Sequence, residues 1–186
     1  VAAGLKYFFS RRARLELIDE IAAQLARFRE TGLELDHWNG HLHFHLHPTV
    51  FACCSAGWNK DRIRAFRLTR DPLRIDWPLG QGRALYRLSH AFILSLLSWR
   101  ARPLLRTAGV AHTDHVFGLL ENDRVTEDYL LKLLPRLPPG DSELYSHPSL
   151  DQSRSEYEAL ISPRVRECIQ REGIELIRYH DLWRNS

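Results

Sequence analysis

The chain has 186 residues, of which 44% are hydrophobic and 26% are charged, values ordinary for one globular domain with a core of its own. Its formal net charge of +3 with histidine neutral, without any block of lysine or arginine, argues against a nucleic-acid-binding protein. Three cysteines without a CxxC pair exclude a zinc knuckle and a disulfide framework and favour the cytoplasm. The sequence has no signal peptide and no apolar run of about 18 residues, so we expect no membrane-spanning helix.

The chain contains no methionine, so Val1 is not an ordinary translation start. We therefore expect these residues to be a fragment, a processed product or a chain that lacks an N-terminal part. No internal repeat, low-complexity tract or linker divides the sequence, and we expect residues 1–186 to form a single domain.

Hydrophobic periodicity predicts helices and strands in alternation. We expect helices over residues 13–30, 48–58, 83–102, 126–134, 154–161 and 163–172, and strands over residues 35–46, 63–68, 115–119, 143–146 and 174–178. Residues 69–82 contain two prolines and two glycines and are expected to form a loop. The alternation is typical of parallel strands joined by helical crossovers, although a closed eight-stranded barrel would need more strands.

The predicted helix at residues 83–102 is strongly apolar between Ala91 and Trp99 and has arginines on both sides of that run. We expect it to be buried. A dimer face and an interfacial helix beside a lipid are the alternatives.

A histidine-rich stretch is the most unusual feature of the sequence. Five of the ten histidines lie between His37 and His47, and from His41 onward they alternate with apolar residues. Period-two alternation predicts a β-strand with the histidines on one face. Neighbouring side chains on one face of a strand are about 7 Å apart, whereas zinc ligands lie about 2 Å from the metal. We therefore expect one or two of these histidines to bind a metal and the others to act as acid/base groups or substrate contacts.

Polar residues also lie at the ends of other predicted strands, namely Arg67, His147 and, more weakly, Asp114 with His115. Sites in parallel β/α folds form at the carboxyl ends of strands. Imidazoles with a guanidinium and a carboxylate suit metal-assisted hydrolysis, in which a metal activates water and a histidine acts as acid or base. Both residues can also be explained without a function. Arg67 would then form a salt bridge at a strand end, and His147 would be a turn residue before a proline. No GxSxG, P-loop or GxGxxG motif supports a serine hydrolase, an NTPase or a dinucleotide-binding enzyme.

Several short motifs occur in order from residue 13 to the end of the chain. They are His37-Trp-Asn-Gly-His41-Leu-His43-Phe-His45, Arg64-Ala-Phe-Arg67 with Asp71-Pro72, Asp114-His-Val-Phe-Gly118, Glu143-Leu-Tyr-Ser-His147-Pro148, Arg154 with Glu156, and Gly173-Ile-Glu-Leu. In this combination they resemble the motifs of the YdjC-like carbohydrate deacetylases, and more closely those of the hopanoid-biosynthesis-associated branch of that family.

This resemblance implies an α/β fold, specifically a distorted (β/α) TIM-like barrel that is incomplete here at its N-terminus, because the chain matches the C-terminal two thirds of the family domain. It also implies a metal-dependent hydrolase that removes the acetyl group from an N-acetylated amino sugar. The branch indicates a glycosylated hopanoid lipid as the substrate. A divalent metal, Mg²⁺ or Zn²⁺, is the implied cofactor.

The resemblance also implies a role for individual residues. His41 is the expected metal ligand, His147 the catalytic acid/base, and Arg67, His43 and His45 the substrate-binding residues. The family's other metal ligands, an aspartate and a histidine, precede the matched region, so our hypothesis is that this chain alone is inactive or strongly impaired.

Two alternatives of another class stay open. One is a non-catalytic histidine-rich metal-binding module, and the other is a membrane-surface interaction protein that uses residues 83–105. A peripheral membrane contact and a homodimer are both compatible with a deacetylase whose substrate is a glycolipid.

Overall fold

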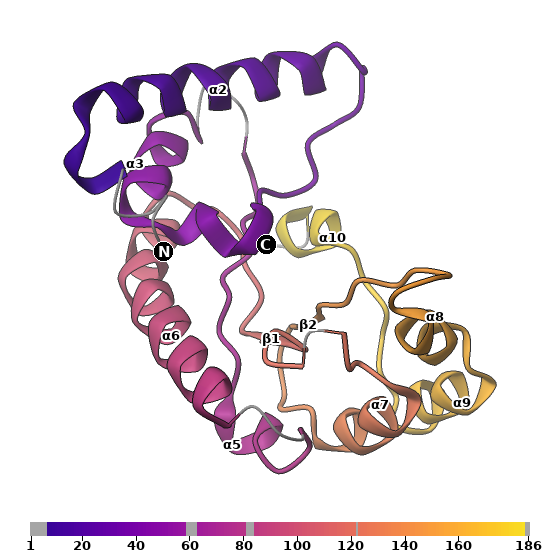
Figure 1. The fold of residues 1–186 in the computed structure, drawn as a ribbon. Helices are drawn as coiled ribbons and strands as arrows, with labels where there is room; N and C mark the ends of the chain where they lie inside the picture. The colour runs from indigo at the N-terminus through magenta and orange to yellow at the C-terminus, as the bar shows by residue number, and fades with distance from the viewer. Residues whose placement is uncertain (1–6, 59–62, 81–83, 122, 185–186) are drawn as a thin grey trace. The chain divides into compact units, whose positions relative to one another are not determined.

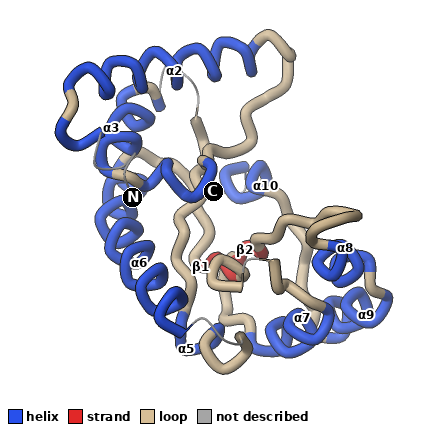
Figure 2. The backbone as a smooth tube through the Cα atoms, in the orientation of Figure 1, coloured by secondary structure: helices blue, strands red, loops and turns tan. Residues whose placement is uncertain are grey.

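The computed structural model describes residues 7–58, 63–80, 84–121 and 123–184 (Figure 1). They divide into two compact units, which we describe separately. Unit 1 contains the described residues up to Arg67, Trp99–His112 and those from Tyr179 onward, and unit 2 contains those of Leu68–Ser98 and Thr113–Arg178. Helices and loops account for most of the described chain, and strand is confined to two short segments (Figure 2).

Unit 1 is mainly helical. Its elements are α2 (Arg11–Arg29), the 3-10 helix η1 (His41–Leu46), α3 (Pro48–Ala56), the C-terminal end of α6 (Ala84–Thr107) and α10 (Tyr179–Arg184). Ser10 caps α2 by accepting a hydrogen bond from the N–H of Ala13. Pro48 opens α3, where its missing N–H is not needed. The first two predicted helices are therefore confirmed, whereas α10 forms where no helix was predicted.

The histidine-rich stretch does not form the predicted strand. It forms η1, in which Leu42 and His43 have φ angles of 51° and 57°, in the left-handed region that residues other than glycine seldom adopt. His45 and Leu46 are both buried, although adjacent residues of a strand would face opposite sides. The alternation of histidine with apolar residues is therefore accommodated by a turn.

Local hydrogen bonds explain why the turn replaces a strand. The N–H of His43 donates to the carbonyl of Gly40 at 3.0 Å, and the N–H of His47 donates to that of Phe44 at 2.9 Å. These donors are then not free for a ladder with a neighbouring strand. Because α3 begins directly after His47, the chain has no room to extend before the next helix.

A short parallel ladder does form just before η1. Trp38 bridges to Phe66, and Ala65 bridges to Ala111, in both cases in parallel. The N–H of Trp38 donates to the carbonyl of Ala65 at 2.9 Å, and that of Phe66 donates to Ala111 at 2.9 Å. The predicted strand at 63–68 is thus present only as single-residue bridges, and its predicted parallel direction is confirmed.

Unit 2 contains the sheet. Strand β1 (His115–Phe117) pairs in parallel with β2 (Ser142–Leu144), so two predicted strands are confirmed at reduced length. The helices of unit 2 are α5 (Leu73–Asp76), the N-terminal part of α6, α7 (Glu127–Leu133), η2 (Leu134–Arg136), α8 (Arg154–Ile161) and α9 (Pro163–Arg171).

The core of unit 2 packs β1 against the helices that follow it. The cluster consists of Phe117, Val125, Tyr129, Leu130, Leu133, Ala159 and Val165. Thr126 caps α7 by accepting from the N–H of Tyr129 at 3.3 Å, and Ser162 caps α9 by accepting from the N–H of Val165 at 3.3 Å. These caps fix where α7 and α9 begin, and both starts agree with the helix ranges predicted from the sequence.

Helix α6 is longer than predicted and continues through Pro103. Its predicted burial holds for one face only, because Ala91 and Leu94 are buried while Phe92 and Trp99 are exposed. None of the described helices combines the length and the apolar character that crossing a bilayer requires.

The described residues form a mixed α/β fold, and the predicted TIM-like barrel is not seen among them. One two-stranded sheet is present there, whereas the sequence predicted five strands. Residues 174–178 form neither helix nor strand, and the predicted loop at 69–82 contains α5. A strand needs hydrogen-bonding neighbours from distant parts of the chain, which the periodicity of one segment does not specify.

Candidate active site

The chain beyond β2 holds His147 close to the end of β1. The N–H of Tyr145 donates to the carbonyl of Phe117 at 2.9 Å and continues the ladder by one residue. Gly118 has a φ of 87°, and a Cβ atom at this position would lie 2.2 Å from the carbonyl oxygen of Tyr145. Both the backbone angle and the close approach require glycine. Gly118 therefore permits the arrangement that positions the segment with His147.

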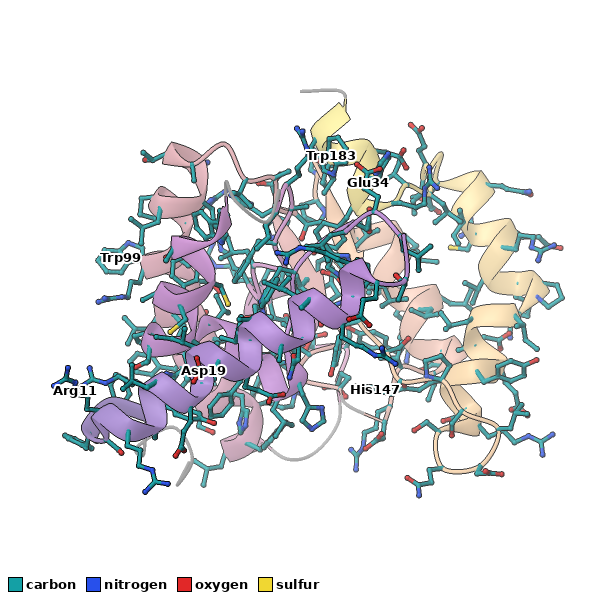
Figure 3. The ribbon with its side chains drawn as sticks, turned by 90° about the horizontal axis from the view of Figure 1, so that it is seen from above. Arg11, Asp19, Glu34, Trp99, His147 and Trp183 are labelled. Atoms are coloured by element: carbon teal, nitrogen blue, oxygen red, sulfur yellow. The ribbon has the colours of Figure 1, made fainter. Side chains whose placement is uncertain are left out.

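His147, labelled in Figure 3, is exposed, and its ring has a phenolic partner. Its Nε2 atom lies 2.8 Å from the hydroxyl of Tyr145, and the two ring centroids are 4.7 Å apart at an interplanar angle of 83°. A hydroxyl donates to an unprotonated ring nitrogen and accepts from a protonated one. Tyr145 can therefore stay bonded to the ring in both protonation states of the imidazole.

Glu156 anchors the main chain of His147 within unit 2. Its carboxylate is fully buried in the first turn of α8. It accepts the N–H of His147 at 2.6 Å and the N–H of Val125 at 3.1 Å. Hydrogen bonds to an ionised acceptor are stronger than those between neutral groups, and they offset the cost of burying the carboxylate. The ring and the main chain of His147 are thus held by different partners.

His45 has a different environment, in unit 1. Its side chain is 1% exposed, its Nδ1 accepts the N–H of Gly40 at 3.0 Å, and its Nε2 lies 2.9 Å from the carbonyl oxygen of Arg67. These two bonds require the neutral tautomer with hydrogen on Nε2. Burial lowers the pKa of His45 to about 3 and outweighs the hydrogen bond to the Arg67 carbonyl, which raises the pKa. Both ring nitrogens are used within the protein.

The other predicted residues of unit 1 lie around His45. The ring centroid of His43 is 6.2 Å from that of His45, and His43 is partly buried. Arg67 is half-buried, and its carbonyl receives the hydrogen bond from His45. His41 is exposed at the start of η1. Unit 1 therefore brings His43, His45 and Arg67 together, while His147 belongs to unit 2.

The described residues do not assemble a metal site. They contain no group of three or more His, Cys, Asp or Glu side chains arranged to hold an ion. His45 cannot contribute a ligand in this arrangement, since both of its ring nitrogens are hydrogen-bonded. The described part of the chain therefore does not fit a divalent metal by itself, and the role of His41 as a ligand stays a prediction.

Unit 2 also buries an ionic cluster that connects α5, α6 and α7. Arg87 Nη2 lies 3.3 Å from Asp76 Oδ2, Arg87 Nε lies 2.9 Å from Glu121 Oε1, and the hydroxyl of Tyr129 donates to Asp76 Oδ1 at 2.6 Å. Asp71 is 5% exposed, and neither of its carboxyl oxygens has a hydrogen-bond partner among the described residues. Burial, together with the negative charge of Asp76, raises the pKa of Asp71 to about 9. Asp71 is therefore protonated at neutral pH.

Two residues that contact His147 in the structure, Tyr145 and Glu156, have no role assigned to them from the sequence. Tyr145 precedes His147 by two positions, a spacing that places both side chains on one face of an extended segment. That spacing is a signal from which Tyr145 could have been found. Glu156 belongs to one of the family motifs, but its partners His147 and Val125 lie 9 and 31 residues away. No local sequence pattern therefore shows its role.

The fold and the site define an α/β protein with parallel strands and an exposed histidine held just beyond a strand. The chain belongs to the family of YdjC-like proteins, which it matches over residues 2–171. The family expected from the motifs is therefore confirmed, and the hopanoid-associated branch stays a prediction.

Two similar proteins add detail. A carbohydrate deacetylase from Brevibacillus brevis is 24% identical over 180 residues, covering 90% of this chain and 61% of the relative. A crystal structure of a proposed cellobiose-phosphate cleavage protein from Enterococcus faecalis matches with a TM-score of 0.60 at 19% identity, covering 91% of this chain and 61% of the other. The second likeness shows the fold alone. The chain thus spans 61% of the length of each protein that it matches.

Proposed function

We propose that the protein carrying this chain is a hydrolase that removes the acetyl group from an N-acetylated amino sugar. Membership of the YdjC-like family and the likeness to a carbohydrate deacetylase support this proposal. The structural observation that carries it is the exposed ring of His147, which Tyr145 contacts at Nε2 while Glu156 holds the main chain.

The residues of unit 2 suit one step of amide hydrolysis. Water adds to the carbonyl carbon, the C–N bond breaks, and the leaving nitrogen must gain a proton. In our proposal His147 donates that proton, so that the products are acetate and the free amino sugar. Tyr145 accepts from Nε2–H while the ring is protonated. We assign no residue among those described as the base that takes the proton of water.

We further propose that Arg67 and His43 contact the sugar, as the motifs predicted. A guanidinium offers several N–H donors in a fixed geometry, which suits hydroxyl and carbonyl oxygens of a carbohydrate. His45 has both nitrogens bonded to the main chain. In this proposal His45 therefore positions the segment of Arg67 against η1 and does not itself touch the substrate.

Dependence on a divalent metal, Mg²⁺ or Zn²⁺, with His41 as a ligand, is a proposal that rests on the family resemblance. Because the described residues do not assemble a set of ligands, we derive no step from a metal. If the proposal holds, a chelator abolishes acetate release and added Mg²⁺ or Zn²⁺ restores it. Acetate release that is unaffected by a chelator would contradict it.

The glycosylated hopanoid substrate is likewise a proposal from the resemblance, whereas the homodimer and the cytoplasmic location are proposals from the apolar helix and the cysteine content of the sequence. A panel of N-acetylated sugars, with and without a lipid anchor, tests the substrate class. Release of acetate only from lipid-anchored sugars would support the glycolipid, whereas release only from soluble oligosaccharides would contradict it.

The direct test of the function is product analysis on the natural protein that contains these residues. We expect acetate and a primary amine to be released in equal amounts from N-acetylated sugars, and the absence of both products across the panel would contradict a deacetylase. His147→Ala should abolish most of this release. His90→Ala, at an exposed histidine of α6, is the matched control and should leave it unchanged.

A further inference from the structure

Helix α6 presents apolar side chains on two opposite faces. The buried face consists of Arg87, Ala91, Leu94, Ser98, Ala101 and Leu105. The exposed apolar stripe, which we call the outer stripe, consists of Leu85, Leu88, Phe92, Leu96 and Trp99. A helix that packs on a core by one face normally has polar residues on the other, so the outer stripe needs an explanation of its own.

The outer stripe is continuous and strongly exposed. At 100° per residue its five side chains lie within about 80° of one another, and along the axis they span about 21 Å. Leu85, Phe92 and Trp99 are 82%, 71% and 77% exposed. Figure 3 shows the side chain of Trp99 projecting outward from α6. Scattered exposed apolar residues are normal on a protein surface, but a contiguous row of this length indicates a contact.

The charges of α6 indicate what covers the stripe. Its 24 residues include no aspartate or glutamate, and the exposed Arg100 and Arg106 flank the stripe at its C-terminal end. A second copy of the chain, packed stripe against stripe, would bring arginines together without a carboxylate on either helix. An anionic lipid surface instead supplies phosphates for the arginines and an apolar layer for the leucines and Phe92.

The remaining features of α6 fit a helix that lies in the plane of the membrane. Tryptophan is enriched at the boundary between headgroups and acyl chains, and Trp99 lies directly beside Arg100. The helix does not meet the requirements for crossing a bilayer. We propose that α6 docks on an anionic membrane, with the outer stripe inserted among the lipids and with Arg100 and Arg106 bound to headgroup phosphates.

The proposal goes beyond the proposed deacetylase function and does not depend on it, because it is tested by binding without substrate. The natural protein is sedimented with vesicles of phosphatidylcholine that contain about one third phosphatidylglycerol, and with vesicles of phosphatidylcholine alone. We expect partition onto the anionic vesicles and at least about tenfold weaker partition onto the neutral ones, because each arginine near an anionic surface contributes separately.

Substitutions on α6 test whether vesicle binding depends on the outer stripe or is unspecific. The double change Phe92→Ser with Trp99→Ser should weaken partition at least about tenfold, and Arg100→Gln about fivefold. Leu176→Ser is the matched control, since Leu176 is also 77% exposed but lies outside α6, and it should leave partition unchanged. Circular dichroism verifies that each variant is folded, as expected for changes at exposed positions.

Two results would overturn the proposal. One is that the natural protein does not partition onto anionic vesicles, or partitions equally well after the double change. The other is that analytical ultracentrifugation shows a dimer that the double change dissociates, without any vesicle binding, because the outer stripe would then be covered by a second copy. Acetate release from a soluble sugar, measured on the same variants, shows separately whether the deacetylase function holds.

Discussion

His45 and His147 are the same residue type in opposite environments. His45 is buried in unit 1, and both of its ring nitrogens bond to the main chain. His147 is exposed in unit 2, its Nε2 pairs with the hydroxyl of Tyr145, and its main chain is held by Glu156. The first arrangement stabilises a neutral ring and the second leaves a ring accessible to a reactant.

A high density of histidines does not give each of them the same environment or the same role. The stretch between His37 and His47 contains half of the histidines of the chain, yet its most buried ring, His45, serves to hold η1 against the segment of Arg67. A single histidine before a proline, His147, has the environment that suits proton transfer. The contrast between the structural role of His45 and the proposed catalytic role of His147 can be tested by changing either residue.

The largest expected effect on stability comes from His45. His45→Ala removes a buried ring and two hydrogen bonds, and we expect the free energy of unfolding to fall by about 3–4 kcal/mol. His147→Ala, at an exposed position, should change it by less than about 0.5 kcal/mol. Urea unfolding of both variants measures the difference, and equal losses would remove the contrast between the two histidines.

Glu156 should come next. Glu156→Ala leaves the buried N–H of Val125 and the partly buried N–H of His147 without their acceptor, so we expect a loss of about 2–3 kcal/mol and slower acetate release. Glu156→Gln keeps one carbonyl acceptor and should lose about 1 kcal/mol. If Glu156→Ala retains both stability and rate, Glu156 does not anchor His147.

The raised pKa of Asp71 should make the free energy of unfolding depend on pH. This pKa of about 9, against an ordinary value of 3.8, means that the folded state binds more protons than the unfolded state between these two values. Stability therefore falls as the pH rises through that window, with a slope of up to about 1.4 kcal/mol per pH unit.

Unfolding by urea at pH 7, 7.5 and 8 tests this effect, because burial of Cys54 raises the pKa of its thiol from 9.0 to about 12 and adds a loss of the same sign only at higher pH. The lowered pKa of His45 has the opposite sign and acts on the acid side, where stability is lost as the pH falls from about 6.5. Asp71→Asn cannot ionise and should flatten the slope above pH 7. A slope that persists in Asp71→Asn would show that another group is responsible.

The smallest expected effect is that of Tyr145→Phe. This change removes the hydroxyl next to His147 Nε2 and should lower kcat about fivefold, equivalent to about 1 kcal/mol, with little change in stability. Tyr157→Phe, at an exposed tyrosine of α8, is the matched control. A Tyr145→Phe variant with an unchanged kcat would show that His147 does not need its phenolic partner.

Local features of this chain could be predicted from the sequence. The predicted helix starts next to Thr126 and Ser162 are confirmed, because a capping hydroxyl and the N–H that donates to it lie only three residues apart. The parallel direction of β1 and β2 is confirmed as well, since it follows from the alternation of helices and strands. The family could be identified from the motifs, and it is confirmed.

Features that depend on distant residues could not be predicted. The bond between the His45 ring and the Arg67 carbonyl joins residues 22 positions apart, and it holds a turn in which Leu42 has a positive φ that no periodicity indicates. Glu156 and Asp71 are buried charged residue types, which composition places at the surface by default. Their roles follow from tertiary packing alone.

The central claim is that His147 supplies the proton in a deacetylation reaction. Its most direct test is the kcat of acetate release from a saturating N-acetylated sugar, measured on the natural protein and on His147→Ala. We expect kcat to fall about 10²–10⁴-fold, while the urea unfolding curve stays the same. A His147→Ala variant that retains the kcat of the natural protein would contradict this account.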